Sequence, residues 1–246
     1  MALRRCSPVA LAALFLGAAA CHSAPGDLDA GPQVAGTVVE EPGGAPISGA
    51  QICILEHPEV GCVQSDSEGS YTLALPTLSS TLDLAVNATA AGHLGFVGLL
   101  EEPPASDGGV NWFSTISLRT DAAAALFFAD AGLAYPAAGK AFLYVSIVDD
   151  TGAALVGETA TLNPASGTGP IYLNDAGTPD PSLTALTSDG ALLFGDLTPG
   201  RVQVTLAGTP CAPIDLGVGA WAAQAAQTVA AETAANSMTT VDVVCP

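Results

Sequence analysis

Positive charge is scarce in this 246-residue sequence, which has 5 lysines and arginines against 24 aspartates and glutamates. Arg4 and Arg5 lie in an N-terminal segment that we expect to be cleaved, which leaves three basic residues and a net charge of −21. So acidic a surface repels phosphate backbones and anionic lipid headgroups. The composition therefore argues against nucleic-acid binding and against membrane docking through basic patches.

Aromatic residues are also few, at 5%, and charged residues make up only 12% of the chain. The apolar fraction of 49% is too high for a disordered chain. The 27 glycines and 18 prolines are too many for a helical bundle. Since the length suits two domains of ordinary size, we expect a loop-rich, all-β protein with two domains.

The N-terminal apolar run, Val9–Leu16, is too short to span a bilayer. Basic residues precede this run and small residues follow it up to Cys21, which is the layout of a secretory signal. We predict a signal peptide over 1–20. The stretch 21–33 is rich in Pro, Gly and Asp and has no apolar period, so we predict a flexible tether there.

Two kinds of processing are compatible with the residues before Cys21. The preceding Ala-Ala-Ala satisfies an ordinary signal peptidase, whereas LGAAAC resembles a bacterial lipobox, although Ala18 stands where a lipobox usually has Leu. If Cys6 is removed and Cys21 is lipidated, an even number of cysteines remains to pair in an oxidising compartment, namely Cys53, Cys62, Cys211 and Cys245. We therefore predict a lipid anchor at Cys21 in a bacterial outer membrane or cell surface, with simple secretion as the alternative.

Four cysteines allow three connectivities, which sequence alone does not separate. Cys53 and Cys62 flank a short segment between two expected strands, and each expected domain contains two cysteines. Pairing between domains would have to bridge two separate cores. We therefore predict that Cys53 pairs with Cys62 as a hairpin staple, and that Cys211 pairs with Cys245 to tie down the last strand.

Short alternating apolar runs, bounded by Gly, Pro or Ser, follow one another after Gln33. Such runs are typical of a β-sandwich or small barrel. A weak internal repeat aligns 36–55 with 144–163 and 65–86 with 187–207. Between the copies, Thr120 or Asp121 can cap a short Ala-rich helix. The predicted organisation is a first sandwich, a helical linker and a second sandwich, over 34–119, 120–139 and 140–246.

The pattern of strand, acidic turn, small-Gly-Ala, strand and Asp-x-Gly resembles carboxypeptidase regulatory-like domains, also called transthyretin-like domains. In the first copy the matching residues are Gly36, Gly44, Pro46, Gly49, Ala50, Asp66, Gly69, Tyr71 and Pro76. In the second copy they are Gly152, Gly157, Asp189, Gly190, Pro199 and Gly200. The resemblance implies an immunoglobulin-like sandwich of about seven strands per copy, in a module that does not itself catalyse a reaction.

The acidic stretches between strands could be turns or cation sites. Asp66 and Asp189 can accept backbone amide bonds beside a turn glycine, and neither copy has the ligand spacing of an EF-hand. The best cation candidates are Asn174, Asp175 and Asp180, although a solvated loop explains them more simply. We therefore predict no metal and no cofactor.

Catalytic motifs are missing from the sequence, which has no HExxH, GxSxG or CxxC pattern. His57 and His93 are isolated, and we expect both at the surface. Lys140 precedes a strand, so the Lys-Asn isopeptide crosslink of some sandwich domains is not expected. We predict a non-enzymatic lipoprotein that acts as a structural or interaction module for a protein or glycan partner. The alternative is a carbohydrate-binding surface protein, for which Trp112 and Trp221 are the tryptophan platforms.

Overall fold

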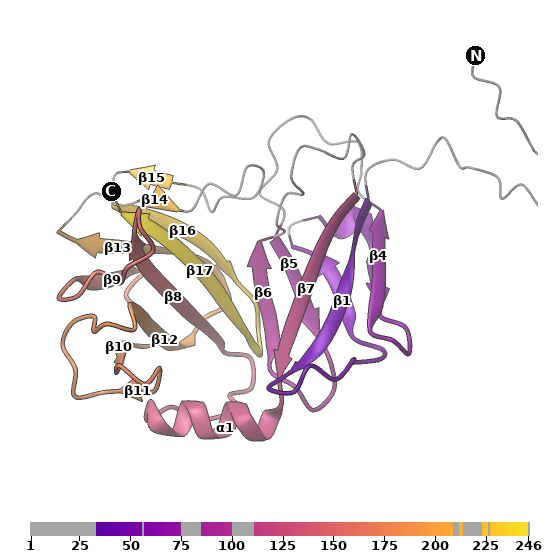
Figure 1. The fold of residues 1–246 in the computed structure, drawn as a ribbon, viewed down its shortest axis with the longest axis horizontal. Helices are drawn as coiled ribbons and strands as arrows, with labels where there is room; N and C mark the ends of the chain where they lie inside the picture. Colours follow the sequence, from indigo (N-terminus) through magenta and orange to yellow (C-terminus); the bar gives the residue numbers. More distant parts are fainter. Residues whose placement is uncertain are drawn as a thin grey trace, which may run out of the picture. The chain divides into compact units, whose positions relative to one another are not determined.

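Two immunoglobulin-like β-sandwiches make up the described part of the chain (Figure 1). The structure is a computed structural model, and it describes residues 33–55, 57–74, 85–99, 111–208, 212–213, 223–225 and 227–245. The predicted all-β fold class with two tandem sandwiches is confirmed. No helix among these residues is long and apolar enough to cross a membrane.

The first sandwich contains seven strands and one 3-10 turn, η1. In chain order they are β1 (Gln33–Glu41), β2 (Gln51–Ile54), η1 (Pro58–Val60), β3 (Cys62–Gln64), β4 (Ser70–Ala74), β5 (Ala85–Thr89), β6 (Gly95–Leu99) and β7 (Asn111–Arg119). The sheet β4-β1-β7 packs over strands in the order β3-β2-β5-β6. Every second residue of β1 is buried, among them Val34 and Val38, which face a core that includes Ile52, Leu73 and Ile116.

The second sandwich follows a helix, α1 (Asp121–Asp130). Its strands are β8 (Ala141–Asp149), β9 (Thr159–Asn163), β10 (Thr168–Leu173), β11 (Pro179–Asp180), β12 (Ala191–Leu197), β13 (Gly200–Ala207), β14 (Ala212–Pro213), β15 (Ala223–Ala225), β16 (Thr228–Thr233) and β17 (Ser237–Cys245). One sheet contains β11-β10-β12-β8-β17, with β14 also paired to β17. The other sheet has the order β15-β16-β13-β9.

The two sandwiches repeat the same strand order, as the sequence repeat predicts. In the first, β1 lies between the antiparallel β4 and the parallel β7. In the second, β8 lies in the same way between β12 and β17. The facing sheets agree as well, since β2-β5-β6 corresponds to β9-β13-β16.

In the strand before the first turn, the structural correspondence between the two copies differs by one residue from the ungapped sequence alignment. The Glu40 N–H donates to the Ala45 carbonyl at 2.8 Å, whereas the Asp149 N–H donates to the Ala153 carbonyl at 2.7 Å. The first turn is therefore one residue longer than the second. The ungapped sequence alignment is wrong by one position in the strand that precedes each turn.

A single sheet passes through both sandwiches, which the sequence did not indicate. Strand β17 pairs with β6 in parallel, with Ser237, Met238 and Thr239 opposite Gly95, Phe96 and Val97. The Gly95 N–H also donates to the Asn236 carbonyl at 3.0 Å. The part of the chain from Gly31 to Pro246 is one compact unit. The predicted domain boundaries at 119 and 140 stay predictions.

Helix α1 starts at the predicted cap, because the Thr120 hydroxyl accepts a hydrogen bond from the Ala123 N–H at 3.2 Å. Its fully buried Phe128 stacks on Phe142 of β8, with ring centroids 4.0 Å apart. Together with Leu193 on β12, these rings form part of a third hydrophobic cluster. The helix therefore covers one part of the outer face of the second sandwich, at the foot of the sheet in Figure 1.

Candidate functional site

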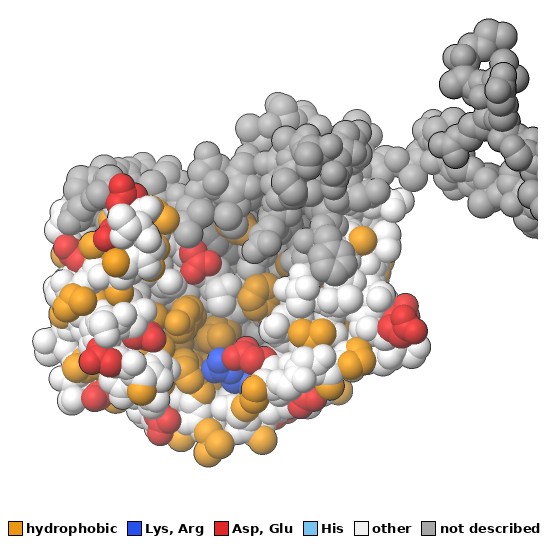
Figure 2. Space-filling view, viewed as in Figure 1, with side chains coloured by type: hydrophobic (Ala, Val, Ile, Leu, Met, Phe, Trp, Pro, Cys, Tyr) orange, Lys and Arg blue, Asp and Glu red, His pale blue; other side chains and the backbone are white. Residues whose placement is uncertain are grey.

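The most distinctive surface feature is a groove where the two sandwiches meet. One face of the shared sheet is covered by β4-β1-β7 in the first sandwich and by α1 in the second. Between these two covers lies a groove of about 260 Å³, bordered by β6, β7 and β17. Figure 2 shows this side of the molecule, with a basic side chain beside an acidic one at the edge of a hollow. We call it the junction groove.

The wall of the junction groove on the β7 side carries Thr115, Ser117 and Arg119. These residues alternate with the buried Ile116 and Leu118, because successive side chains of a strand point to opposite faces. The opposite side consists of Phe96, Met238 and Thr240. The groove therefore combines hydroxyl groups with apolar surface.

Arg119 is held in place at one end of the groove. Its Nη2 donates to Oε1 of Glu41 at 2.7 Å, and its guanidinium carbon lies 4.6 Å from the ring centroid of Phe127. Glu41 and Arg119 are opposite each other in the parallel pairing of β1 and β7. The Arg119 side chain is 20% exposed and that of Glu41 is 43% exposed. The cation is thus already neutralised by a neighbour, and Arg119 is the one basic residue among the described residues that line the groove.

Acidic groups dominate the electrostatics around the groove. Tyr144 on β8 is partly buried, and desolvation raises the pKa of its phenol to about 12, with further contributions from the Asp189 and Asp242 carboxylates. Arg119 opposes this shift and Glu41 adds to it. Three carboxylates and one guanidinium are therefore close enough to affect the pKa of this phenol.

The free edge of β7 faces the groove. Leu94 N–H donates to the Arg119 carbonyl at 2.9 Å, and Asp121 N–H donates to the Gly92 carbonyl at 2.9 Å. These two bonds form a short antiparallel ladder that pairs His93 with Thr120. The ladder stops there, because the next residues turn away to pair with β17. Within the described residues, no strand continues it along β7.

The two turns that end at Gly69 and Gly190 differ in which side chain caps them. Asp66 Oδ1 accepts from the N–H groups of Glu68 and Ser70, each at 2.9 Å, as predicted. In the second copy Thr187 takes this place, and its hydroxyl accepts from the Asp189 N–H at 3.3 Å. The prediction that Asp189 caps its turn is wrong. Instead, Asp189 Oδ2 is buried without a hydrogen-bond partner among the described residues.

The turn glycines keep the same role in both copies. Gly69 and Gly190 have φ values of +75° and +72°, which an L side chain rarely adopts. A Cβ at Gly69 would collide with the carbonyl of Val38, and a Cβ at Gly190 with the carbonyl of Ile147. Glycine is therefore required at these two positions by backbone geometry and by close approach.

The three cation candidates all accept hydrogen bonds, Asn174 and Asp180 within their own turns and Asp175 from Ser188, 13 positions away. Asn174 Oδ1 accepts from the N–H groups of Ala176 and Thr178 at 2.9 and 3.2 Å. The other two candidates are carboxylates, and each accepts a hydrogen bond from a serine hydroxyl. Asp175 accepts from Ser188 Oγ at 2.7 Å, and Asp180 accepts from Ser182 Oγ at 2.6 Å. Among the described residues, no group of three or more His, Cys, Asp or Glu is placed to hold a metal.

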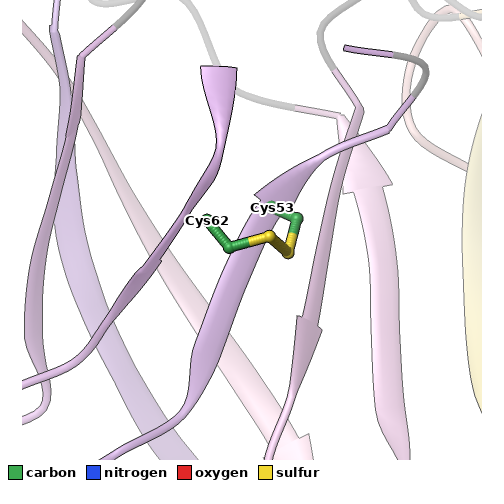
Figure 3. The surroundings of a disulfide bond; sticks show 2 residues. All are labelled: Cys53 and Cys62. Atoms are coloured by element: carbon green, nitrogen blue, oxygen red, sulfur yellow. A yellow bond between two sulfur atoms is a disulfide. The ribbon is translucent and has the colours of Figure 1, made fainter. Parts of the chain in front are cut away.

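The disulfide between Cys53 and Cys62 is confirmed. The two cysteines lie opposite each other on β2 and β3, with their Cα atoms 4.4 Å apart (Figure 3). Cys245 is fully buried and disulfide-bonded. Cys211 lies outside the described residues, so its pairing with Cys245 stays a prediction. Cys21 also lies outside them, together with the predicted signal peptide.

The remaining predicted residues lie away from the groove or at its margin. His57 Nδ1 donates to Glu59 Oε1 at 2.8 Å, and His93 Nδ1 donates to the Ala91 carbonyl at 3.0 Å. Lys140 is exposed and sits just before β8. The side chain of Trp112 and the whole of Trp221 lie outside the described residues. Their role as glycan platforms therefore stays a prediction.

Sequence reasoning missed Arg119 and the junction groove. Arg119 is one of three basic residues after the signal peptide, and it ends an alternating strand directly before the helix cap. A rare basic residue at the end of a predicted strand is a signal that could have identified Arg119 as a candidate. The groove itself depends on the pairing of β6 with β17, which joins residues more than 130 positions apart and leaves no local signal.

No protein-family model matches the sequence, and no curated protein sequence matches it. Among solved structures the chain is similar to the Bacillus anthracis TIE protein, with 13% identity and a TM-score of 0.28, over 87% of this chain and 34% of that protein. It is similar to shaft pilin SpaA from Lactobacillus rhamnosus GG, with 14% identity and a TM-score of 0.27, over 87% and 98% of the two chains. It is also similar to GBS52, a minor pilin of Streptococcus agalactiae, with 13% identity and a TM-score of 0.27, over 88% and 97%. At these scores the likenesses carry no argument about function, and the sandwich assignment rests on the strand order.

Proposed function

We propose that this protein is a non-enzymatic extracytoplasmic lipoprotein whose paired sandwiches form an interaction module. The observation that carries this proposal is the continuous sheet through both sandwiches, which fixes them as one body with a groove between them. A rigid pair of sandwiches presents a defined surface without reorganisation on binding, and this favours recognition. Among the described residues that line the groove, no nucleophile has a neighbouring general base, so the proposal includes no catalysis.

The direction of the strands suits a module that is tethered at one end. Residues 92–94 precede β6 and contact residues 119–121 after β7, so β6 starts where β7 ends. Because β1 is parallel to β7 and β17 is parallel to β6, Gln33 and Cys245 lie at the same end of the molecule. Helix α1 follows β7, so it lies at the end opposite Gln33, which is the last residue of the proposed tether.

The lipid anchor at Cys21 is the part of the proposal that is simplest to test. Cys21→Ser should move the protein from the membrane fraction to the soluble fraction of a bacterial host, because a lipidated cysteine would supply the main membrane affinity. Cys6→Ser is the matched control, since Cys6 would be removed with the signal peptide. Membrane partitioning that is unchanged in Cys21→Ser would refute the anchor.

Membership of the carboxypeptidase regulatory-like family is also a proposal. Its support is the paired requirement for glycine at Gly69 and Gly190, each next to a backbone carbonyl of the first strand of its sandwich. Carbohydrate binding remains the alternative function. The hydroxyl groups of Thr115, Ser117 and Thr240 beside the Phe96 ring are the observation that favours it.

A further inference from the structure

The edge of β7 presents backbone groups to the junction groove that pair with no other described strand. In a β-strand, the N–H and C=O of one residue point to the same edge, and those of the next residue point to the other. Since the Arg119 carbonyl accepts from Leu94 N–H on the groove side, the backbone groups of Ser117 and Thr115 point to that side as well. Among the described residues none pairs with them. Directly beyond the ladder begun by residues 92–94 thus lie positions of β7 that no described strand occupies.

An exposed strand edge of this length is unusual without protection. Natural sheets cover their edge strands, shorten them, or mark them with charges and prolines. Strand β7 has nine residues, and within Thr115–Arg119 its only charged side chain is Arg119, which is bonded to Glu41. The edge therefore has the properties of a site for strand addition.

The floor beneath this edge defines what an added strand would contact. Met238 lies opposite Phe96 in the pairing of β17 with β6, so both side chains are on the same face of the shared sheet. Thr240 follows two residues later on that face, and Tyr144 is opposite Thr240 on β8. Alternate side chains of an added strand would rest on this apolar and hydroxyl-bearing strip.

Charge around the groove selects the kind of strand. Arg119 is bonded to Glu41, and Asp242 is exposed on β17, on the face that carries Thr240. The whole chain has 24 acidic residues and only 5 basic ones. A basic segment would be attracted at long range, and an acidic one would be repelled.

We propose that the junction groove binds an extended peptide segment of a partner protein, with alternating apolar and basic side chains, as an additional strand on the free edge of β7. The inference rests on the proposed interaction module and identifies its partner. It does not depend on the lipid anchor, because peptide binding is measured on the full chain released by Cys21→Ser. Failure of the anchor experiment and failure of the binding experiment are therefore distinguishable.

The probe is a seven-residue peptide of alternating lysine and valine, acetylated and amidated, with a fluorophore for anisotropy measurements. It should bind the full chain, and binding should weaken as salt is raised. Two further peptides of equal charge carry N-methyl groups on either the odd or the even backbone amides. Because a strand presents one edge to β7, only one of these two sets should lose affinity, by about tenfold or more.

Two variants of the protein separate backbone pairing from hydroxyl recognition. Ser117→Pro removes the free N–H without touching the bonds between β7 and β1, and should weaken peptide binding by about tenfold. Ser117→Ala keeps the N–H and should bind like the unmodified protein. If Ser117→Pro fails to fold, the comparison of the two N-methylated peptides still decides the question.

Three results would overturn the proposal. The first is an equal response to both N-methylated peptides, or no binding of the probe. The second is an equal loss in Ser117→Ala and Ser117→Pro, which would point to recognition of the hydroxyl group, as by a glycan. The third is a dimer in sedimentation analysis that Ser117→Pro dissociates, which would make a second copy of this chain the occupant of the edge.

Discussion

Asp189 shows at the scale of a single residue how the two copies diverge. It corresponds to Glu68 of the first copy, because Gly190 N–H donates to Thr187 as Gly69 N–H does to Asp66. The sequence already shows that the two aspartates are not equivalent, since Asp66 precedes Gly69 by three residues and Asp189 precedes Gly190 by only one. An acidic residue close before a glycine predicted the turn correctly in both copies, but not which side chain caps it.

Burial and the nearby Asp175 carboxylate raise the pKa of Asp189 above its ordinary value. The folded protein therefore holds this proton more tightly than the unfolded chain does, and stability falls as the pH rises from the ordinary carboxyl range through the raised pKa. Above the raised pKa the cost is fully present. Asp189→Ala should then increase the free energy of unfolding at pH 7 by about 1 kcal/mol, a value at the low end for a buried unsatisfied group.

The gain should shrink as the pH falls below the raised pKa, because the carboxyl is then neutral in the folded protein too. Denaturant unfolding at pH 7 and pH 4 measures both values. Glu68→Ala is the control at the equivalent exposed position, where a change within about 0.5 kcal/mol is expected. Loss of stability in Asp189→Ala at pH 7 would mean that the carboxylate has a partner in solution.

Local elements could be predicted from the sequence more readily than the groove that they enclose. The hydroxyl of Thr120 and the alanines after it predict α1, because capping and propensity act within a few residues. The strands followed from alternation in the same way. The position of α1 on the second sandwich depends on Phe142 and Leu193, which are distant in sequence. Such packing has no local signal.

Phe128 should anchor α1 to the second sandwich. Its ring is fully buried, stacks on Phe142 and lies 5.4 Å from the ring of Tyr135. Phe128→Ala should therefore lower the free energy of unfolding by about 3–5 kcal/mol. Leu126→Ala on the same helix is the control, because Leu126 is 73% exposed and its loss should cost less than about 0.5 kcal/mol. Equal effects of the two substitutions in denaturant unfolding would show that the helix is not docked.

The hairpin of β2 and β3 should depend on its disulfide. The bond joins residues 9 positions apart and restricts the unfolded chain, which in the chain-entropy model is worth about 2–3 kcal/mol for a loop of this size. The double variant Cys53→Ala with Cys62→Ala should lose about that much stability in denaturant unfolding. Gln64→Ala, at an exposed position of β3, serves as the control. A double variant as stable as the unmodified protein would mean that strain in the folded hairpin cancels the entropic gain.

At the scale of the whole molecule, the shared sheet makes the two sandwiches interdependent. Ala85 and Val97 belong to strands of the first sandwich, yet they pack in the core of the second. The Ser237 hydroxyl of β17 donates a hydrogen bond to Asn87 Oδ1 of β5 at 3.3 Å. Each sandwich also has a core of its own. Both sandwiches should therefore unfold in one cooperative transition while β6 and β17 are paired. Once this pairing is broken, each sandwich should unfold in a transition of its own.

Gly95 is the residue at which this pairing can be broken. It is buried opposite Ser237, and a Cβ there would collide with the Ser237 hydroxyl and crowd the Asn236 carbonyl. Gly95→Val should therefore force β6 and β17 apart, which withdraws Val97 from the second core and costs about 1–3 kcal/mol. Scanning calorimetry should show one transition for the unmodified protein and two for Gly95→Val, because each sandwich then melts on its own core. Ala91→Val, at an exposed position before β6, should retain the single transition.

Since the junction groove exists only while β6 and β17 are paired, Gly95→Val should also fail to bind the lysine-valine peptide. A single transition in Gly95→Val with unchanged cooperativity would show that contacts other than the shared sheet couple the two halves.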